Sequence, residues 1–357
     1  MSSSIQIDGR SIGVDYAPYV IAELSANHNG SFERAQQLIT IAAEAGADAV
    51  KLQTYRPDTI TLNSDAEGFV IKGGLWSGRR LYDLYAEAML PWEWHAPLFE
   101  HARKCGITIF SSPFDATAID LLETLNAPAY KIASFEAVDL PLIEYAASTG
   151  KPLIISTGMA DAGEIAEAVE CAQKSGCKDL AILHCISGYP TPIEECNLRT
   201  ISDMSTRFGL VTGLSDHTLD NTAAIAAVAL GASIIEKHFT LSRNDGGPDD
   251  SFSLEPLELK KLCRDARSAW SSVGRVDYGL KSSERGNIQF RRSLYYVKSL
   301  SAGDTITSDA IRSVRPGFGA APKHWNKIIG MRVRKAVSQN TPVRLDEIDG
   351  WPAEAEE

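Results

Sequence analysis

The feature that most constrains the fold is a series of eight short, apolar, β-branched runs, each ending in a polar residue. The predicted strands are Tyr19–Glu23, Ala49–Gln53, Ile107–Ser111, Ala129–Lys131, Leu153–Ser156, Leu180–His184, Leu210–Ser215 and Ser233–His238. Their ends lie about 31 residues apart on average, the length of a strand plus a returning helix. Eight such units predict an α/β fold of the (β/α)8 TIM barrel type.

Helical patterns fill most of the intervals between these runs, and Gly or Asn follows most of them, as expected where a helix stops. The predicted helices are Phe32–Ala45, Pro97–Cys105, Ala116–Leu125, Gly163–Lys174 and Glu255–Ser272. Gly274 would terminate the last one, so the barrel should close near residue 275. We therefore predict a barrel catalytic domain over residues 1–280.

The interval between the second and third strands is unusually long, with 58 residues from Gln53 to Ser111. It contains an insertion, Arg56–Trp94, that is rich in aromatic residues, glycine and charge. Loops after barrel strands lie over the C-terminal mouth, so the insertion is predicted to be a substrate lid or wall. The alternative is a helix that packs against the outside of the barrel.

The character of the sequence changes after Gly279. Residues 281–292 are polar and basic and are predicted to be a linker. Residues 293–357 contain short apolar runs broken by Gly, Pro and Asn, which predicts a second, small domain.

The composition limits what the protein can bind and where it can work. Its formal charge of −11 argues against nucleic-acid and membrane partners, and requires that an anionic substrate be held by a few well-placed cations. Its six cysteines form no CxxC pair, which favours a reducing compartment. No basic segment followed by an apolar one begins the sequence, and no long apolar run occurs. We expect a cytoplasmic protein.

Lys51 and Lys131 stand within predicted apolar strands. Burying an ammonium group costs several kcal/mol unless an anion compensates it. A phosphate or carboxylate ligand would do so. The alternative is an internal ion pair with Glu23 or Glu236.

His217 and His238 end consecutive strands and should be neighbours at the barrel mouth. Two converging imidazoles suit a divalent transition metal, whose other ligands would be water, substrate oxygens and a carboxylate such as Glu23 or Asp249. A proton-relay or hydrogen-bonding role is the alternative. His184 is expected to be structural.

The order of short motifs resembles that of the sialic acid (nonulosonic acid) synthase family, which adds phosphoenolpyruvate to an amino-sugar aldehyde. The motifs are IAELSANHNGSFERA, ADAVKLQTY, SSPFD, YKIAS, STGMA, LHCISGYPTP, GLSDHT, EKHFT, GPDD and, further on, VRPG. The small domain resembles the antifreeze-like (SAF, β-clip) domain of these synthases. Within the family, GGLWSGRRLYDLYAEAMLPWEWH is similar to the corresponding segment of pseudaminic acid synthases.

This resemblance implies a role for each matching position. Phosphoenolpyruvate binding is implied for Lys51, Ser112, Lys131, Ser134, Ser156 and Ser215. Sugar contacts are implied for Gln53, Tyr189, Glu236, Asp249 and Arg315. The implied catalytic residues are Glu23, His217 and His238, and the two histidines would hold a divalent cation (Mn, Mg or Co).

The sequence departs from the neuraminate synthases at two places. Ser112 stands where they usually have Thr, which keeps the hydroxyl. Ser187-Gly188 before Tyr189 replaces a pair that bears Asn. The second departure is consistent with a different sugar.

The resemblance therefore implies a metal-dependent enzyme that condenses phosphoenolpyruvate, a 2,4-diacetamido-2,4,6-trideoxyhexose and water into a nonulosonic acid, with pseudaminic acid as the expected product. The alternative is the same chemistry on N-acetylmannosamine or the legionaminic acid precursor. Because Arg315 lies in the small domain, a domain-swapped homodimer is also implied. A barrel metal hydrolase usually has an HxH pair on the first strand, whereas this strand ends Ala22-Glu23-Leu24. A carbohydrate-binding protein would leave the two strand lysines unexplained.

Overall fold

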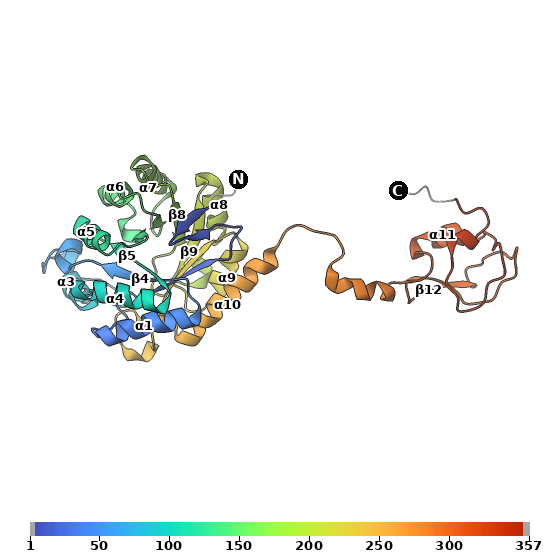
Figure 1. Cartoon of the computed structure of the whole chain (residues 1–357), viewed down its shortest axis with the longest axis horizontal. Coiled ribbons are helices and arrows are strands. Elements are labelled where there is room, and N and C mark those ends of the chain that lie inside the picture. The colour runs from blue at the N-terminus through green and yellow to red at the C-terminus, as the bar shows by residue number, and fades with distance from the viewer. Residues whose placement is uncertain (1–3, 353–357) are drawn as a thin grey trace. The chain divides into compact units, whose positions relative to one another are not determined.

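The computed structural model describes residues 4–352 (Figure 1). Contacts within the chain divide it into two compact units, one ending at Gly274 and the other beginning at Arg275.

The first unit contains a closed barrel of eight parallel strands, as the sequence predicts. Around the barrel the order is β10-β3-β4-β5-β6-β7-β8-β9. The strands are β3 (Tyr19–Glu23), β4 (Ala49–Thr54), β5 (Thr108–Pro113), β6 (Tyr130–Ile132), β7 (Leu153–Ser156), β8 (Leu180–Cys185), β9 (Val211–Asp216) and β10 (Ile234–His238). Each begins and ends within one or two residues of the predicted limits, because the apolar runs are bounded by polar or turn-forming residues.

Helices surround this barrel and bury one apolar face against it (Figure 1). They are α1 (Phe32–Ala45), α2 (Pro57–Ile60), α3 (Leu81–Ala88), α4 (Trp92–Cys105), α5 (Ala116–Thr124), α6 (Leu140–Ser148), α7 (Ala162–Lys174), α8 (Arg199–Phe208), α9 (Thr222–Ala229) and α10 (Pro256–Val273). Short 3-10 helices lie between them: η1 (Glu67–Phe69), η2 (Ser134–Glu136), η3 (Ile193–Glu195), η4 (Arg243–Asp245) and η5 (Asp250–Phe252). The larger apolar core lies between the helices and the outer face of the strands.

The helix predicted over Pro97–Cys105 begins five residues earlier, at Trp92. Pro97 lies inside this helix, where it removes one backbone donor without ending the helix. Helices α6, α8 and α9 were not delimited from the sequence.

A short hairpin of β1 (Ile5–Ile7) and β2 (Arg10–Ile12) precedes the barrel and was not predicted. Ile5, Ile7 and Ile12 are buried in a second apolar cluster with residues from the barrel strands, such as Tyr19 and Phe110. The hairpin thus packs against the interior of the barrel near the amino ends of its strands, which leaves the carboxyl ends for the polar side chains.

The second unit has a small apolar core of its own, which includes Leu294, Tyr296 and Ile328. Its elements are η6 (Ser282–Phe290), β11 (Ser293–Tyr296), β12 (Ile311–Val314), η7 (Pro322–His324), α11 (Trp325–Ile328) and η8 (Leu345–Glu347). The segment expected as a linker, residues 281–292, contains η6. Across residues 4–352, no helix combines the length and the apolar character needed to cross a bilayer.

Candidate active site

The carboxyl ends of the barrel strands carry nine of the predicted site residues. These are Glu23 on β3, Lys51 and Gln53 on β4, Ser112 on β5, Lys131 on β6, Ser156 on β7, Ser215 on β9, and Glu236 and His238 on β10. Four more follow strands directly or lie in the loops after them: Ser134, Tyr189, His217 and Asp249. Parallel strands in a closed barrel end at one rim, so these side chains share the barrel mouth.

Two lysines and two carboxylates form a buried ionic cluster inside the mouth. Lys51 Nζ lies 2.5 Å from Glu23 Oε2 and 3.7 Å from Glu236 Oε1. Lys131 Nζ lies 3.1 Å from Glu236 Oε1. Lys51 and Lys131 are 3% and 1% exposed, so each ammonium depends on these carboxylates for compensation. The internal ion pairs considered as an alternative are therefore present within the protein.

This cluster drives the pKa values of its two carboxyl groups apart. Burial raises the pKa of Glu23 above its usual range, despite the lowering effect of Lys51. Burial also disfavours ionisation of Glu236, but the charges of Lys131 and Lys51 outweigh it and lower that pKa. Two neighbouring carboxyls with opposite shifts are typical of acid–base sites, where one holds a proton and the other stays ionised.

Hydroxyl groups surround the lysines. Lys51 Nζ donates to Ser112 Oγ at 3.0 Å, and Ser215 Oγ donates to Glu236 Oε1 at 3.4 Å. Ser156 is 1% exposed, and its Oγ has no hydrogen-bond partner among the described residues. A buried hydroxyl without a partner calls for an explanation, and a bound ligand is one.

The loop after β7 comes close to Ser134. The backbone N–H of Gly158 donates to Ser134 Oγ at 3.1 Å. A Cβ at residue 158 would lie 2.7 Å from that oxygen and 2.3 Å from Ser187 Oγ. A side chain at residue 158 would require both hydroxyls to shift, so glycine allows the backbone amide to lie beside them in the mouth.

The rings of His217 and His238 lie 5.4 Å apart, centroid to centroid. His217 Nδ1 lies 2.9 Å from the carbonyl oxygen of Ile186, which fixes the ring and leaves Nε2 for another partner. Nδ1 of His238 is buried and has no hydrogen-bond partner in the described part of the chain. Burial and the nearby charge of His217 lower the pKa of His238 well below its usual range, so its imidazole is neutral and keeps a lone pair.

This pair fits a divalent cation as an open, two-histidine site. Within residues 4–352 there is no cluster of three or more His, Cys, Asp or Glu side chains that could hold one ion together. Glu23 and Asp249, expected as possible further ligands, bond instead to Lys51 and to Ser25 Oγ. Water or substrate oxygens would have to complete the coordination.

A second polar group lines the side of the mouth formed by β3, β4 and the loop after β10. Gln53 Nε2 donates to Glu23 Oε1 at 3.1 Å and to Ser25 Oγ at 3.0 Å. Ser25 Oγ donates in turn to Asp249 Oδ2. Tyr189 lies beside this group, with its ring 4.4 Å from that of His217. Of the residues expected to contact sugar, Gln53, Tyr189, Glu236 and Asp249 therefore gather around Glu23 and the histidines.

The insertion after β4 reaches this mouth through Trp76. Its Nε1 donates to the carbonyl oxygen of Pro248 at 3.2 Å, and its ring lies 5.9 Å from that of Tyr189. Pro248 directly precedes Asp249. This part of the insertion therefore lies over the mouth, whereas its predicted role in sugar recognition is not tested by the structure.

Besides Ser25, two residues of the mouth stand outside the set expected from the sequence. Glu136 in η2 has a buried carboxyl oxygen without a hydrogen-bond partner, and burial raises its pKa to about 7. Cys185 ends β8, and its Sγ lies 3.8 Å from His217 Nδ1. Side chains alternate along a strand, so Cys185 faces the opposite side of β8 from His184, the predicted end of this strand. His184 Nε2 lies 2.7 Å from the Cys196 carbonyl oxygen. The alternation could therefore have identified Cys185 as the residue that faces His217.

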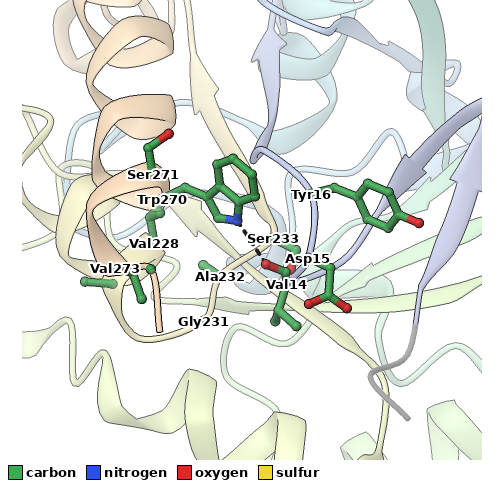
Figure 2. A pocket seen from close by; sticks show the side chains of 12 residues that line it. Val14, Asp15, Tyr16, Val228, Gly231, Ala232, Ser233, Trp270, Ser271 and Val273 are labelled. Atoms are coloured by element: carbon green, nitrogen blue, oxygen red, sulfur yellow. Dashed lines mark hydrogen bonds between the residues drawn. The ribbon is translucent and has the colours of Figure 1, made fainter. Parts of the chain in front are cut away.

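Arg315, the remaining predicted site residue, is exposed and follows β12 in the second unit. Its sugar contact stays a prediction. A separate hollow of about 490 Å³ lies near the amino ends of β3 and β10, between Val14–Tyr16, the segment around Ser233, and the end of α10 (Figure 2). Trp270 lines it and donates Nε1 to the Val14 carbonyl oxygen at 2.9 Å. It contains none of the predicted site residues.

Comparison with known proteins gives two family matches: the NeuB family over residues 38–278 and the SAF domain over residues 291–349. The pseudaminic acid synthase of Helicobacter pylori is 42% identical over 334 residues, 93% of this chain and 98% of that protein. The N,N'-diacetyllegionaminic acid synthase of Campylobacter jejuni is 36% identical over 329 residues, 91% of this chain and 98% of that protein. Among solved structures, the N-acetylneuraminic acid synthetase of Leptospira borgpetersenii in complex with citrate has a TM-score of 0.73 and 31% identity, covering 82% of this chain and 97% of that one.

Proposed function

Because the chain belongs to the NeuB family, we propose that it is a pseudaminic acid synthase. The chain is an enzyme of the transferase class that condenses phosphoenolpyruvate with an amino sugar. The proposed sugar is 2,4-diacetamido-2,4,6-trideoxy-L-altrose, and the products are pseudaminic acid and phosphate.

The observation that carries the choice of sugar is the similarity to a pseudaminic acid synthase along 93% of the chain, which exceeds the similarity to a legionaminic acid synthase of nearly equal coverage. The insertion that bears Trp76 supports the same choice, because it lies over the mouth and resembles the corresponding segment of pseudaminic acid synthases. Synthesis of N-acetylneuraminic or legionaminic acid from another amino sugar is the alternative.

The ionic cluster is suited to phosphoenolpyruvate, which carries a phosphate and a carboxylate. We assign these anions to Lys51 and Lys131, with Ser112, Ser134, Ser156 and Ser215 as the surrounding hydroxyl donors. Ser156 Oγ and the Gly158 amide support this assignment, since the first has no partner and the second faces Ser134. Charge-assisted hydrogen bonds to a phosphate are among the stronger ones in proteins.

The proposed reaction joins C3 of phosphoenolpyruvate to the aldehyde carbon of the sugar, and the aldehyde oxygen takes a proton to become a hydroxyl. Water adds at C2 and gives up a proton, after which the tetrahedral centre loses phosphate and becomes a ketone. We assign the proton of this water to Glu23, because burial raises the pKa of this carboxyl and makes it a better proton acceptor than an exposed glutamate. Glu136, with a pKa of about 7, is a second carboxyl able to accept a proton.

We further propose that His217 and His238 hold a divalent cation, Mn, Mg or Co. The neutral state of His238 and its unpartnered Nδ1 support this. Such a cation supplies Lewis-acid polarisation of a carbonyl oxygen. Tyr189 lies against both imidazoles, with its ring centroid 4.4 Å from that of His217 and 6.1 Å from that of His238.

A domain-swapped homodimer is proposed as the assembly, with Arg315 completing the partner's site. Large apolar side chains support it, because they are exposed on four loops at the rim of the mouth: Phe135 (60%), Met159 (64%), Ile193 (54%) and Leu219 (53%). Mixing Glu23→Ala with Arg315→Ala subunits should restore about a quarter of full activity, since half the dimers are mixed and one of their two sites is whole. No recovery after co-refolding, with mixed dimers shown by mass, would contradict the swap.

All six cysteines are free thiols, which supports the proposed cytoplasmic location.

The enzyme assignment is tested by phosphate release. Release should require phosphoenolpyruvate and the amino sugar together, because the phosphate leaves only after the new carbon–carbon bond has formed. Sugar binding without phosphate release would favour a carbohydrate-binding protein instead.

A further inference from the structure

Asp216 and Lys237 form a buried ion pair directly behind the two histidines. Asp216 immediately precedes His217, and Lys237 immediately precedes His238. The two residues are register partners of β9 and β10, and Lys237 Nζ lies 2.8 Å from Asp216 Oδ2. Their side chains are 2% and 1% exposed, respectively. Because side chains alternate along a strand, this pair projects from the opposite face of the sheet to the neighbouring histidines.

The ammonium group of Lys237 also holds the loop that carries His217. It donates to the carbonyl oxygen of Thr218 at 2.7 Å and to that of Asp220 at 2.8 Å. Asp216 Oδ1 accepts from the Thr218 amide at 2.9 Å. One side chain of β10 thus bonds to the last residue of β9 and, through Thr218 and Asp220, to the loop that carries His217.

These bonds account for every donor of Lys237 and leave nothing for a ligand. An ammonium has three N–H groups, and Asp216, Thr218 and Asp220 provide three acceptors within 2.8 Å. Lys51 and Lys131, in contrast, reach into the mouth. Lys237 is therefore not a ligand-binding residue. What requires an explanation is an ion pair buried behind the proposed metal site, whose geometry depends on the distance between the imidazole rings of His217 and His238.

A buried ion pair is often no more stabilising than a pair of apolar residues of similar size, but it permits fewer arrangements of the backbone around it. The arrangement that it fixes here includes the 5.4 Å separation of His217 and His238. In the proposed site only two side chains bind the cation, so no third protein ligand could compensate for a change in the distance between them.

We propose that Asp216 and Lys237 are positioning residues, whose ion pair sets the spacing of His217 and His238 for a divalent cation. This inference rests on the proposed metal site. It assigns to the pair a role in cation affinity beyond the stability that any buried ion pair provides.

The test measures Mn²⁺ affinity by electron paramagnetic resonance in the full-length protein without substrates. Lys237→Met should weaken Mn²⁺ binding by about 10-fold or more, within the range found for groups that orient metal ligands. Because Lys237→Met leaves Asp216 buried and unpaired, the double variant Asp216→Asn, Lys237→Met provides a second measurement in case the single variant does not fold. The double variant leaves no unpaired charge at this position but still lacks the hydrogen bonds from Lys237 to the loop. Its Mn²⁺ affinity should therefore fall by the same factor.

Arg10→Met is the matched control. Arg10 pairs with Asp48 near the amino ends of the strands, so its loss should lower the melting temperature without changing Mn²⁺ affinity. Phosphoenolpyruvate affinity, measured by calorimetry without metal, should stay within about twofold of wild type in all three variants, since Lys51 and Lys131 are unchanged.

The outcomes separate this inference from the function on which it rests. Folded variants of Lys237 that bind Mn²⁺ within about twofold of wild type would overturn the positioning role and leave the metal site intact. Failure of the wild-type protein to bind Mn²⁺ would overturn the metal site itself, and the inference with it.

Discussion

Lys51 Nζ and Glu23 Oε2 lie 2.5 Å apart in the barrel mouth, so the lysine assigned to a substrate anion also pairs with the carboxyl assigned to proton transfer. An anion bound at Lys51 would share its charge and weaken the interaction that opposes the rise in the pKa of Glu23. The pKa of Glu23 would then rise further from its already raised position. Binding of phosphoenolpyruvate and the protonation state of Glu23 are therefore coupled through this one contact.

Lys131→Met should raise the KM for phosphoenolpyruvate by about 10- to 100-fold, because a hydrogen bond to a charged group contributes about 1.5–3 kcal/mol. The KM for the sugar should change much less. Steady-state kinetics with each substrate varied in turn measures both values. Lys174→Met, on the exposed surface of α7, is the control and should change neither. An unchanged phosphoenolpyruvate KM with normal kcat would assign Lys131 to a structural ion pair with Glu236.

His238→Ala should abolish both Mn²⁺ binding and activity and leave the barrel folded, since the side chain lies at the mouth and outside the apolar core. A chelator should have the same effect on the wild-type enzyme, and added Mn²⁺ should restore activity there but not in the variant. Circular dichroism checks the fold, and His324→Ala in the second unit is the control. Full turnover of His238→Ala in the presence of chelator would contradict the two-histidine site.

Trp76→Ala should raise the KM for the sugar severalfold and leave that for phosphoenolpyruvate nearly unchanged. The substitution removes the ring contact with Tyr189 and the hydrogen bond to the Pro248 carbonyl oxygen, which together define one side of the mouth. Leu75→Ala changes the exposed neighbouring residue and should have no effect. Equal kinetics for Trp76→Ala and wild type would move sugar recognition to other loops.

Glu136 should make the stability of the protein fall as pH rises. Burial raises its pKa to about 7 from a usual value of 4.5, so the folded state holds a proton that the unfolded chain has already released. The loss of stability occurs between those two values as the pH increases. Glu136→Gln keeps a neutral side chain, and its melting temperature should therefore exceed that of wild type by more at pH 8 than at pH 5.

The control for this measurement is Asp309→Asn. Hydrogen bonds from Lys298 and Thr307 hold the pKa of Asp309 at about 2, so its carboxyl is ionised throughout this range. The Asp309→Asn substitution should therefore change the melting temperature by the same amount at pH 5 and pH 8. If the difference in melting temperature between Glu136→Gln and wild type were the same at pH 5 and pH 8, Glu136 would not titrate between these pH values.

The barrel was predictable from the sequence because each strand is a local apolar run with a polar end. The limits of β3 and β7 agree with prediction to the residue. Prolines and short elements were less informative. Pro97 predicts a later start for α4 than the structure has, because the helix accommodates this proline. The strands of the β1–β2 hairpin have only three residues each, too few to show an alternating pattern.

The site was predictable where a residue ends a strand. It was not predictable where burial gives an ordinary residue its properties. Glu136 stands in the short helix η2, where burial and, to a smaller extent, the charge of Asp139 raise its pKa. Lys237 belongs to the EKHFT motif, whereas three of its four contacts come from the path of the loop after β9, which sequence does not reveal.

The central claim, that this enzyme makes pseudaminic acid, is tested most directly by comparing three sugars with phosphoenolpyruvate and Mn²⁺. The sugars are 2,4-diacetamido-2,4,6-trideoxy-L-altrose, N-acetylmannosamine and the legionaminic acid precursor. Phosphate release gives kcat/KM for each, and mass spectrometry identifies the nine-carbon acid formed. The account predicts a kcat/KM for the altrose derivative at least about tenfold above that for either other sugar. An equal or higher value for N-acetylmannosamine or the legionaminic acid precursor would contradict it.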